Sequence, residues 1–211
     1  LGTLTDLPEA DQGKECIPES TRGLRVAARS LTFSHFDEQK LLEQLDFDIE
    51  PGEKVTLVAG EGAGKSTLAA LLAGQLTSGF GTLELDGLDS GTLRKEDWAR
   101  NVVWLHDREE LFEGDLEENL KLGRPATGHE LRWALQASGL HEHLAGLPKG
   151  LKSPIVRSGR NLSNSQIERL LIARTMLTHP RLILLDRALE SLGPERLPAL
   201  LDQLFRPSNR W

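Results

Sequence analysis

The sequence has no tyrosine, one cysteine (Cys16), one methionine (Met176) and no long run of apolar residues. A single cysteine cannot form a disulfide within the chain, so a reducing compartment is the simpler expectation. No apolar run approaches the length that crosses a bilayer and no signal-peptide pattern is present, so a membrane role requires a partner or another part of the protein. Because the chain begins at Leu1 and its only methionine is internal, we expect a piece of a longer or processed product.

An excess of positive charge is also absent. The formal net charge is −7 at pH 7 over 211 residues. Non-specific binding to nucleic acids requires a basic surface that replaces the phosphate counterions, so we expect no nucleic-acid partner. The length and a hydrophobic content of 38% are typical of one globular domain with its own core.

The order of the sequence patterns predicts a linker followed by an α/β domain. Residues 1–23 are polar, contain several Pro and Gly residues and show no sustained period, which is typical of a linker. Residues 115–144 alternate helix-like stretches with Gly and Pro, which indicates a helical insertion. Strands that alternate with helices favour a largely parallel sheet. We expect strands at 24–33, 53–59, 81–87, 101–105 and 181–186, and helices at 64–76, 164–177 and 194–205.

The segment AGEGAGKST, residues 59–67, lies between an expected strand and an expected helix. Its glycines allow a tight turn in which successive N–H groups point inward and form an anion-binding nest. Lys65 adds a charge for the β- and γ-phosphates of a nucleotide, and Ser66 offers a hydroxyl to Mg²⁺. The formal P-loop pattern begins with Gly where Ala59 stands, and Glu61 is interpreted as facing solvent. The predicted nucleotide-binding residues here are Gly60, Glu61, Gly62, Ala63, Gly64, Lys65, Ser66 and Thr67.

The apolar strand expected at 181–186 ends in an acid, Asp186. A P-loop requires an acid on a second strand that holds Mg²⁺ through water. Ser66 and Asp186 are therefore the predicted Mg²⁺ residues.

The segment NLSNSQIERLLIAR, residues 161–174, lies between the P-loop and Asp186. Together with them it resembles the signature segment of ATP-binding cassette (ABC) ATPases, whose usual form is LSGGQ. The spacings from Lys65 to Ser163 and on to Asp186 are similar to those of transporter nucleotide-binding domains. LTDLPEADQG resembles the segment that joins the membrane part of an exporter to its ATPase, and LFEGDLEENL resembles the exporter-type stretch after the Q-loop. The resemblance covers the chain from about residue 24 to its end.

This resemblance implies a P-loop NTPase (RecA-like) core with a mainly parallel sheet, an antiparallel β part and a helical signature subdomain. Residues 24–106 and 176–211 would form the core, residues 107–175 the helical subdomain, and the chain would stop before the strand that carries the switch histidine. The family implies ATP and Mg²⁺ as cofactors and a head-to-tail dimer with a second nucleotide-binding domain, identical or different. It also implies the transmembrane domain of a transporter as a partner, at the cytoplasmic side of the plasma membrane.

The signature positions, which would face the ATP held by the partner domain, depart from the usual form. Asn164 and Ser165 replace two glycines that let the backbone approach a phosphate, so we expect a looser contact. The segment could also be an ordinary capped helix start, but its spacing favours a signature. The predicted signature residues are Leu162, Ser163, Asn164, Ser165 and Gln166.

The position of the family's catalytic glutamate is occupied by Arg187, so no catalytic residue is intact. An arginine stays protonated and cannot accept a proton from the attacking water. Loss of such a base typically lowers the rate by ~10²–10⁴-fold. Two interpretations of Arg187 stay open: it retains ATP from a place near the γ-phosphate, or it pairs with Glu190.

Three further family positions are altered. The Q-loop glutamine falls at Asp107, which is a further candidate for Mg²⁺ or, as we prefer, one of several solvated acids. The adenine-stacking aromatic falls at His35, for which stacking and an ordinary surface histidine are equally supported. The D-loop aspartate is replaced by Gly193.

These departures leave the phosphate cradle intact and affect the hydrolytic positions. We therefore expect the ATP-binding domain of an ABC-type transporter that drives or regulates transport, with weak hydrolysis in its own site. A fully active transport ATPase and a non-hydrolysing structural partner half are the alternatives. A small P-loop kinase is disfavoured, because it would leave the signature segment unexplained.

Overall fold

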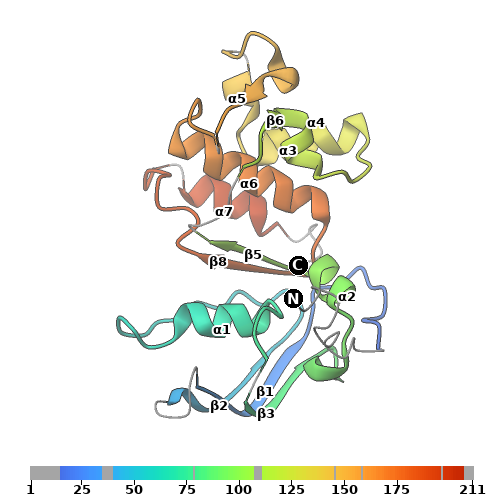
Figure 1. The fold of residues 1–211 in the computed structure, drawn as a ribbon, viewed down its shortest axis with the longest axis vertical. Coiled ribbons are helices and arrows are strands. Elements are labelled where there is room, and N and C mark those ends of the chain that lie inside the picture. Colours follow the sequence, from blue (N-terminus) through green and yellow to red (C-terminus); the bar gives the residue numbers. More distant parts are fainter. Residues whose placement is uncertain are drawn as a thin grey trace, which may run out of the picture. The chain divides into compact units, whose positions relative to one another are not determined.

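The computed structural model describes residues 15–34, 40–77, 79–106, 111–144, 146–157, 159–195 and 197–206. The chain forms two compact units, unit 1 at Leu1–Val102 and unit 2 at Val103–Trp211. Both contain helices and paired strands (Figure 1), so the α/β class expected from the sequence is confirmed. The expected limits of the linker, the core and the helical subdomain stay predictions.

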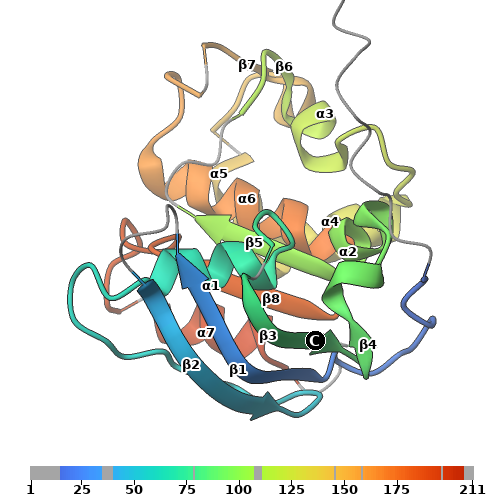
Figure 2. The same ribbon diagram turned by 60° about the horizontal axis from the view of Figure 1, so that its bottom comes forward.

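Unit 1 is built on a four-stranded sheet in the order β2-β1-β3-β4 (Figure 2). Every pairing in it is antiparallel, which matches the antiparallel β part expected from the resemblance. The inner strand β1 is buried over most of its length: Val26, Ala27 and Ala28 form one buried run and residues 31–33 a second, and only Arg29, Ser30 and the last residue are exposed. The elements of unit 1 are β1 (Val26–Ser34), β2 (Lys40–Ile49), α1 (Lys65–Leu72), β3 (Phe80–Leu85), β4 (Leu88–Asp89), η1 (Ser90–Thr92) and α2 (Lys95–Asn101).

Helix α1 ends earlier than the expected range of 64–76. Its C-cap is Ala73, and Gly74 follows with a φ of 70°. A Cβ at Gly74 would lie 2.5 Å from the ring of Trp98 on α2. The indole of Trp98 also donates a hydrogen bond to the carbonyl oxygen of Leu72, at 2.9 Å. The helix therefore stops where α2 packs over its last turn.

Unit 2 contains two small sheets and the longest described helix. Strands β5 and β8 pair with each other, and β6 pairs antiparallel with β7. The helical insertion predicted at 115–144 is confirmed as α3, α4 and α5. The elements are β5 (Val102–His106), β6 (Gly114–Asp115), α3 (Leu116–Lys121), α4 (Gly128–Ala137), α5 (His141–Leu144), η2 (Gly150–Lys152), β7 (Pro154–Ile155), α6 (Asn164–Thr178), β8 (Leu182–Asp186) and α7 (Leu197–Leu204).

Helix α6 is the centre of unit 2. Residues 169–176 are all buried, so the helix is enclosed on every side rather than along one stripe. In Figure 1 the helices α6 and α7 lie beside β5 and β8, and α3 and α4 contact α6 on its other side. Its apolar residues Leu170, Ile172 and Met176 join the main hydrophobic cluster, which reaches from Leu105 to Leu204.

A buried amide ties α3 to α6 and to the segment before α3. Asn119 has no exposed surface. Its Oδ1 accepts from the backbone N–H of Phe112 at 3.1 Å, and its Nδ2 donates to the carbonyl oxygens of Phe112 (3.0 Å) and Asp115 (3.1 Å). Arg174 of α6 donates through Nε to the carbonyl oxygen of Asn119 at 2.9 Å. These bonds satisfy polar groups that the core would otherwise leave unpaired.

The strand expected at 53–59 is absent from the described structure. Residues 53–60 have no regular secondary structure, and Val55, Leu57 and Val58 are 57%, 52% and 87% exposed. An apolar segment becomes a strand only when a neighbour accepts and donates its backbone hydrogen bonds. The described sheet of unit 1 is formed by β1 to β4, and this segment pairs with none of them.

Candidate functional site

The glycine-rich segment lies in unit 1 and opens helix α1. Gly64 is the N-cap of the helix in the left-handed conformation, with a φ of 82°, and Gly62 has a φ of 73°. Glycine adopts these angles without steric cost. A Cβ at Gly64 would lie 2.8 Å from Cδ2 of Leu42 on β2, so this glycine is also needed for packing. The helix start has no side-chain cap, which leaves its first N–H groups available to a ligand.

Lys65 folds back over this loop. Its Nζ donates to the carbonyl oxygens of Ala59 at 2.9 Å and of Gly60 at 2.6 Å. A Cβ at Gly60 or Gly62 would meet no atom within 4 Å, so the loop is open at both positions. The ammonium group, the glycine turn and the uncapped helix start together fit the phosphate groups of a nucleotide.

The eight P-loop residues differ in exposure. Gly60, Glu61, Gly62, Ala63 and Ser66 are exposed, and Gly64, Lys65 and Thr67 are half-buried. The hydroxyl predicted for Mg²⁺ and the acid Glu61 are therefore both accessible. His35 lies outside the described residues, so the structure says nothing of its role.

Asp186 and Arg187 lie at the end of β8 in unit 2. Asp186 is half-buried and is the last residue of the strand, as predicted. Arg187 is exposed and has a φ of 58°, which is uncommon for a residue with a side chain. Both Arg187 and Glu190 are described, and the structure has no ion pair between them. Asp107, the other acid proposed for Mg²⁺, lies outside the described residues.

The signature residues form the start of α6. Ser163 is the N-cap: its Oγ accepts from the backbone N–H of Gln166 at 3.3 Å, and Oε1 of Gln166 accepts from the backbone N–H of Ser163 at 2.8 Å. This reciprocal capping box fixes where the helix begins. Asn164 is exposed, Leu162 and Ser165 are half-buried, and no acid lies in the first turn. A helix start without acids favours an approaching anion.

The structure thus places the predicted residues in two sets. The P-loop belongs to unit 1, whereas Asp186, Arg187 and the signature segment belong to unit 2. Within unit 2, Asp186 and Arg187 precede a loop that contacts α6. Its Ser191 donates a backbone hydrogen bond to Oε1 of Glu168 at 2.8 Å.

Gly193, at the D-loop aspartate position, has a neighbour that sequence reasoning missed. A Cβ at Gly193 would collide with both carboxylate oxygens of Glu195. The carboxylate of Glu195 therefore occupies the space that a side chain at position 193 would need. In the sequence, the only sign of this contact is that Gly193 and Glu195 are two positions apart.

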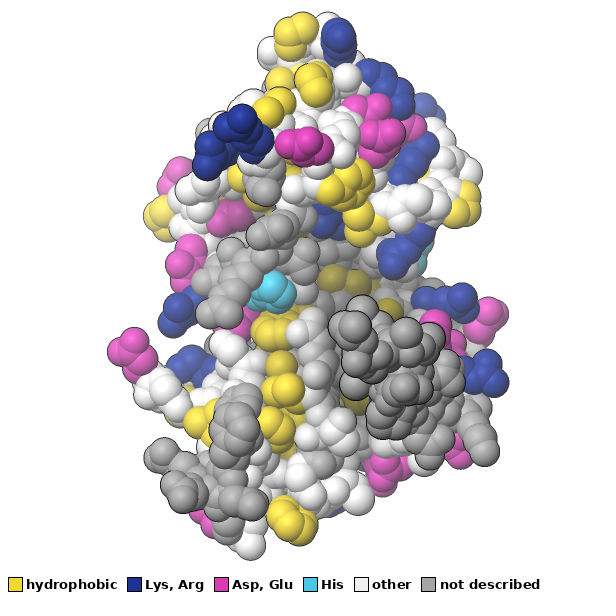
Figure 3. Space-filling model, viewed as in Figure 1, with side chains coloured by type: hydrophobic (Ala, Val, Ile, Leu, Met, Phe, Trp, Pro, Cys, Tyr) yellow, Lys and Arg dark blue, Asp and Glu magenta, His cyan; other side chains and the backbone are white. Residues whose placement is uncertain are grey.

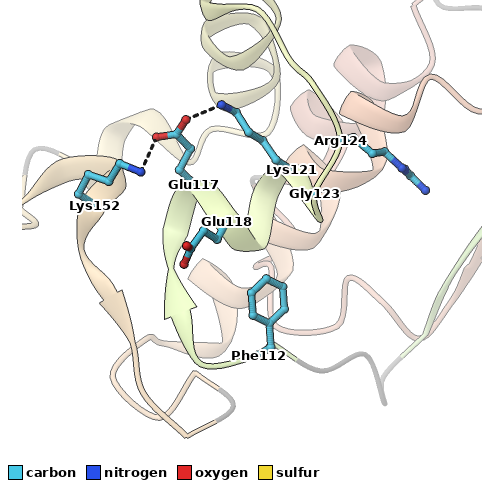
Figure 4. Close-up of a pocket in the computed structure, with 7 residues that line it drawn as sticks. All are labelled: Phe112, Glu117, Glu118, Lys121, Gly123, Arg124 and Lys152. Carbon is cyan, nitrogen blue, oxygen red and sulfur yellow. Dashed lines mark hydrogen bonds and ion pairs between the residues drawn. The ribbon is translucent and has the colours of Figure 1, made fainter.

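A group of charged side chains around α3 was also missed. Lys152 binds Oδ2 of Asp115 at 3.0 Å. It also binds Oε2 of Glu117 at 3.1 Å, and Glu117 pairs with Lys121 (Figure 4). The spacing of Glu117 and Lys121 is that of a helical ion pair, whereas the contact with Lys152 has no local signal. A pocket here is lined by Phe112, Glu117, Glu118, Lys121, Gly123, Arg124 and Lys152.

These contacts shift the ionisation of the group. The backbone N–H of Glu118, and then Lys152, lower the pKa of Asp115. Hydrogen bonds from Lys121 and then Lys152 lower the pKa of Glu117. The two carboxylates in turn raise the pKa of Lys152. On the face that Figure 3 presents, acidic and basic side chains are interspersed.

The described helices include none that is both long and apolar enough to cross a bilayer.

Comparison with known proteins places these features in one family. The family model described as ABC transporter matches residues 42–190. This range contains the P-loop, the signature segment, Asp186 and Arg187.

Two curated relatives illustrate the match. The ATP-dependent lipid A-core flippase of Chromobacterium violaceum is 33% identical over 202 residues, which cover 94% of this chain and 34% of that protein. The glutathione/L-cysteine transport system ATP-binding/permease protein CydD of Bacillus subtilis is 29% identical over 209 residues, which cover 97% of this chain and 36% of that protein. The chain thus spans about a third of the length of these relatives.

A solved structure shows the same fold. A bacterial Atm1-family ABC exporter with ATP bound superposes with a TM-score of 0.85 and 25% identity, over 97% of this chain and 35% of that one. The likeness to exporter relatives confirms the expected P-loop NTPase fold. Because the family model covers more than half of its length, the chain belongs to the ABC transporter family.

Proposed function

We propose that the chain is the ATP-binding domain of an exporter-type transporter, which binds Mg·ATP and hydrolyses it weakly in its own site. The single observation that carries the proposal is the P-loop at the start of α1. There, Gly62 and Gly64 adopt left-handed angles and Lys65 stands over the loop carbonyl oxygens of Ala59 and Gly60. This set of groups is suited to a polyphosphate.

The chain's own residues bind and orient the nucleotide in this proposal. Lys65 exchanges its bonds to the loop carbonyls for bonds to phosphate oxygens, which carry full negative charge and are the better acceptors. The N–H groups at the start of α1 contribute further donors. Ser66 and Asp186 are the proposed Mg²⁺ residues, and His35 is the proposed contact to adenine. Bound ATP would supply the phosphoanhydride bond whose hydrolysis powers transport.

Weak hydrolysis follows from the residue after Asp186. Arg187 keeps its proton at any working pH, so it cannot accept one from water. Its side chain is exposed and has no ion pair with Glu190. A cation in this place favours retention of a nucleotide over its hydrolysis.

The partners are proposed from the family. A second nucleotide-binding domain would meet the signature segment, whose capped start on α6 carries a favourable partial charge for its ATP. The transmembrane domain of the transporter would hold the pair at the cytoplasmic side of the membrane. The substrate would be selected by that membrane domain.

Calorimetric titration with Mg·ATP tests the proposal. We expect the chain to bind, and Lys65→Ala to weaken binding by about tenfold to a hundredfold, because charge-assisted bonds are lost. Lys95→Ala is the matched control, since Lys95 is an exposed lysine of the same unit outside the loop. If the folded chain gives no heat with Mg·ATP, or if both variants lose binding equally, the proposal is wrong.

A further inference from the structure

The loop after β8, residues 187–195, is held to unit 2 by two apolar residues. Ala188 and Leu192 are 9% and 5% exposed and belong to the hydrophobic cluster of this unit. Ser191, between them, is exposed, and its backbone N–H points to a side chain of α6. The half-buried Leu189 packs against the same cluster, so the position of the loop depends on this apolar packing and on the polar contact at Ser191.

That polar contact comes from Glu168. Its Oε1 accepts from the backbone N–H of Ser191 at 2.8 Å, a length typical of a charge-assisted hydrogen bond. Glu168 lies five residues after Ser163, the N-cap of α6. The capping box between Ser163 and Gln166 fixes the start of that helix. A single carboxylate thus joins the helix of the signature segment to the loop that begins with Arg187.

The other oxygen of Glu168 makes the position unusual. Its Oε2 is buried and has no hydrogen-bond partner in the part of the chain that the structure describes. A buried acceptor without a donor costs free energy, and such groups in native proteins require a reason.

Arg187 supplies a second sign that the loop is held under constraint. Its φ of 58° places a residue with a side chain in the left-handed region. Such conformations persist when the surrounding structure enforces them, and they are concentrated at functional sites. The contacts described for the same loop are the bond from Ser191 to Glu168 and the burial of Ala188, the residue after Arg187.

We propose that Glu168 is a positioning residue: it holds the loop 187–195, and with it Arg187, in a fixed position relative to the start of α6. The inference rests on the proposed function, because Arg187 would lie near the ATP of its own domain and the signature segment would face the ATP of the partner domain. Under this assignment a displacement of the start of α6 moves the loop 187–195, and a displacement of the loop moves the start of α6.

The first test measures the bond itself, by amide hydrogen exchange of Ser191 in the whole chain. We expect Glu168→Ala to accelerate this exchange by about tenfold or more, because a bond to a charged acceptor is lost. Glu168→Gln keeps a neutral acceptor oxygen at the same place, so its rate should lie between the native rate and that of Glu168→Ala. Glu142→Ala, which removes an exposed acid of α5, is the control. Unchanged exchange in Glu168→Ala would overturn the inference, whether or not the chain binds ATP.

The second test measures coupling. With Mg·ATP added, we expect amides 164–167 and amides 188–192 of the native chain to change their exchange together. In Glu168→Ala the loop should no longer follow the helix start, and Glu168→Gln should restore the coupling. If Glu168→Ala accelerates Ser191 but the two segments still respond together, the bond is structural only and the inference fails. If the native chain does not bind Mg·ATP in calorimetry, it is the proposed function that fails, and the first test still judges the bond.

A second variant protects the test against misfolding of Glu168→Ala. Ser191→Pro removes the N–H donor from the loop side and leaves α6 unaltered. We expect amides 187–190 to exchange faster in this variant, as in Glu168→Ala. Native exchange of these amides in Ser191→Pro would contradict the assignment.

Discussion

The Nζ of Lys65 lies 2.6 Å from the carbonyl oxygen of Gly60, five residues before it in the same loop. The lysine is thus held by the loop that it would use to bind phosphate. Its ammonium group has lost part of its hydration and is already oriented, which lowers the cost of ordering it around a ligand. The glycines determine whether this loop can form.

Gly64→Ala should destabilise the chain more than Gly62→Ala. Both residues have a positive φ, which costs about 1 kcal/mol or more for alanine. At Gly64 the added Cβ also meets Leu42 at 2.8 Å, whereas at Gly62 it meets no atom within 4 Å. Urea unfolding of the two variants measures the difference in the free energy of unfolding. Equal losses would show that Leu42 moves away at little cost.

Arg187→Glu alone should not bring ATP hydrolysis to the rate of an ordinary cassette. A base at this position is typically worth ~10²–10⁴-fold in rate. Here the signature, Q-loop and D-loop positions are altered as well. We expect a partial gain over the native chain, measured as phosphate release at saturating Mg·ATP. Arg187→Gln, which removes the charge without adding a base, is the control. A full recovery in Arg187→Glu would contradict the account of several separate defects.

Gly193→Asp should lower stability, and Glu195→Ala should relieve this effect. The new side chain would enter the space held by the carboxylate of Glu195 and would bring a second negative charge beside it. Because this carboxylate is the end of an exposed side chain that can swing aside, the loss should be small, about 0.5 kcal/mol or less in the single variant and smaller in the double variant, as measured by a double-mutant cycle of unfolding free energies. Additive effects of the two substitutions would show that these side chains do not meet.

The stability of unit 2 should fall in acid partly through Lys152. The folded-state pKa values of Asp115 and Glu117 are lowered, so their contribution is complete above the unfolded-state values of about 4. This contribution to the free energy of unfolding is lost as the pH falls through the lowered folded-state pKa values. The reason is that the folded state binds these protons only at a lower pH than the unfolded state does. Lys152→Met should therefore flatten the decrease in unfolding free energy below about pH 4.

Lys149→Met provides the matched control for this pH series. Lys149 is an exposed lysine three residues from Lys152. Urea unfolding between neutral pH and pH 3 should give the native slope in Lys149→Met. A native slope in Lys152→Met as well would mean that the lysine contributes nothing to the lowered pKa values.

Much of the fold follows from local patterns in the sequence. Residues 164–177 were predicted as a helix and form α6, and residues 181–186 form β8 apart from their first residue. Strand β2 was missed although Leu45, Phe47 and Ile49 alternate with acids, the pattern of a half-buried strand. All three elements are marked by the periodicity of their apolar residues, which can be read from a short stretch of sequence.

The features that the sequence did not predict depend on contacts between residues that are far apart in the sequence. Residues 53–59 have the composition of a strand, but a strand also needs a partner, and the described sheets provide none for them. The P-loop and the capped start of α6 were predictable because each is a continuous motif. The bonds of Lys152 to Asp115 and of Glu168 to Ser191 join segments that are distant in the sequence, so only the folded chain shows them.

The buried amide of Asn119 joins the segment 112–115 to α3, and Arg174 joins α3 to α6, through oriented hydrogen bonds that add to the apolar packing of the two helices. Neither aspartate, which lacks the two donors, nor leucine, which lacks donors and acceptor, can reproduce this arrangement. A secreted protein often secures such a junction with a disulfide. The hydrogen bonds of Asn119 and Arg174 do not depend on thiol reagents or on the redox state of the surroundings. This is consistent with a chain that has one cysteine.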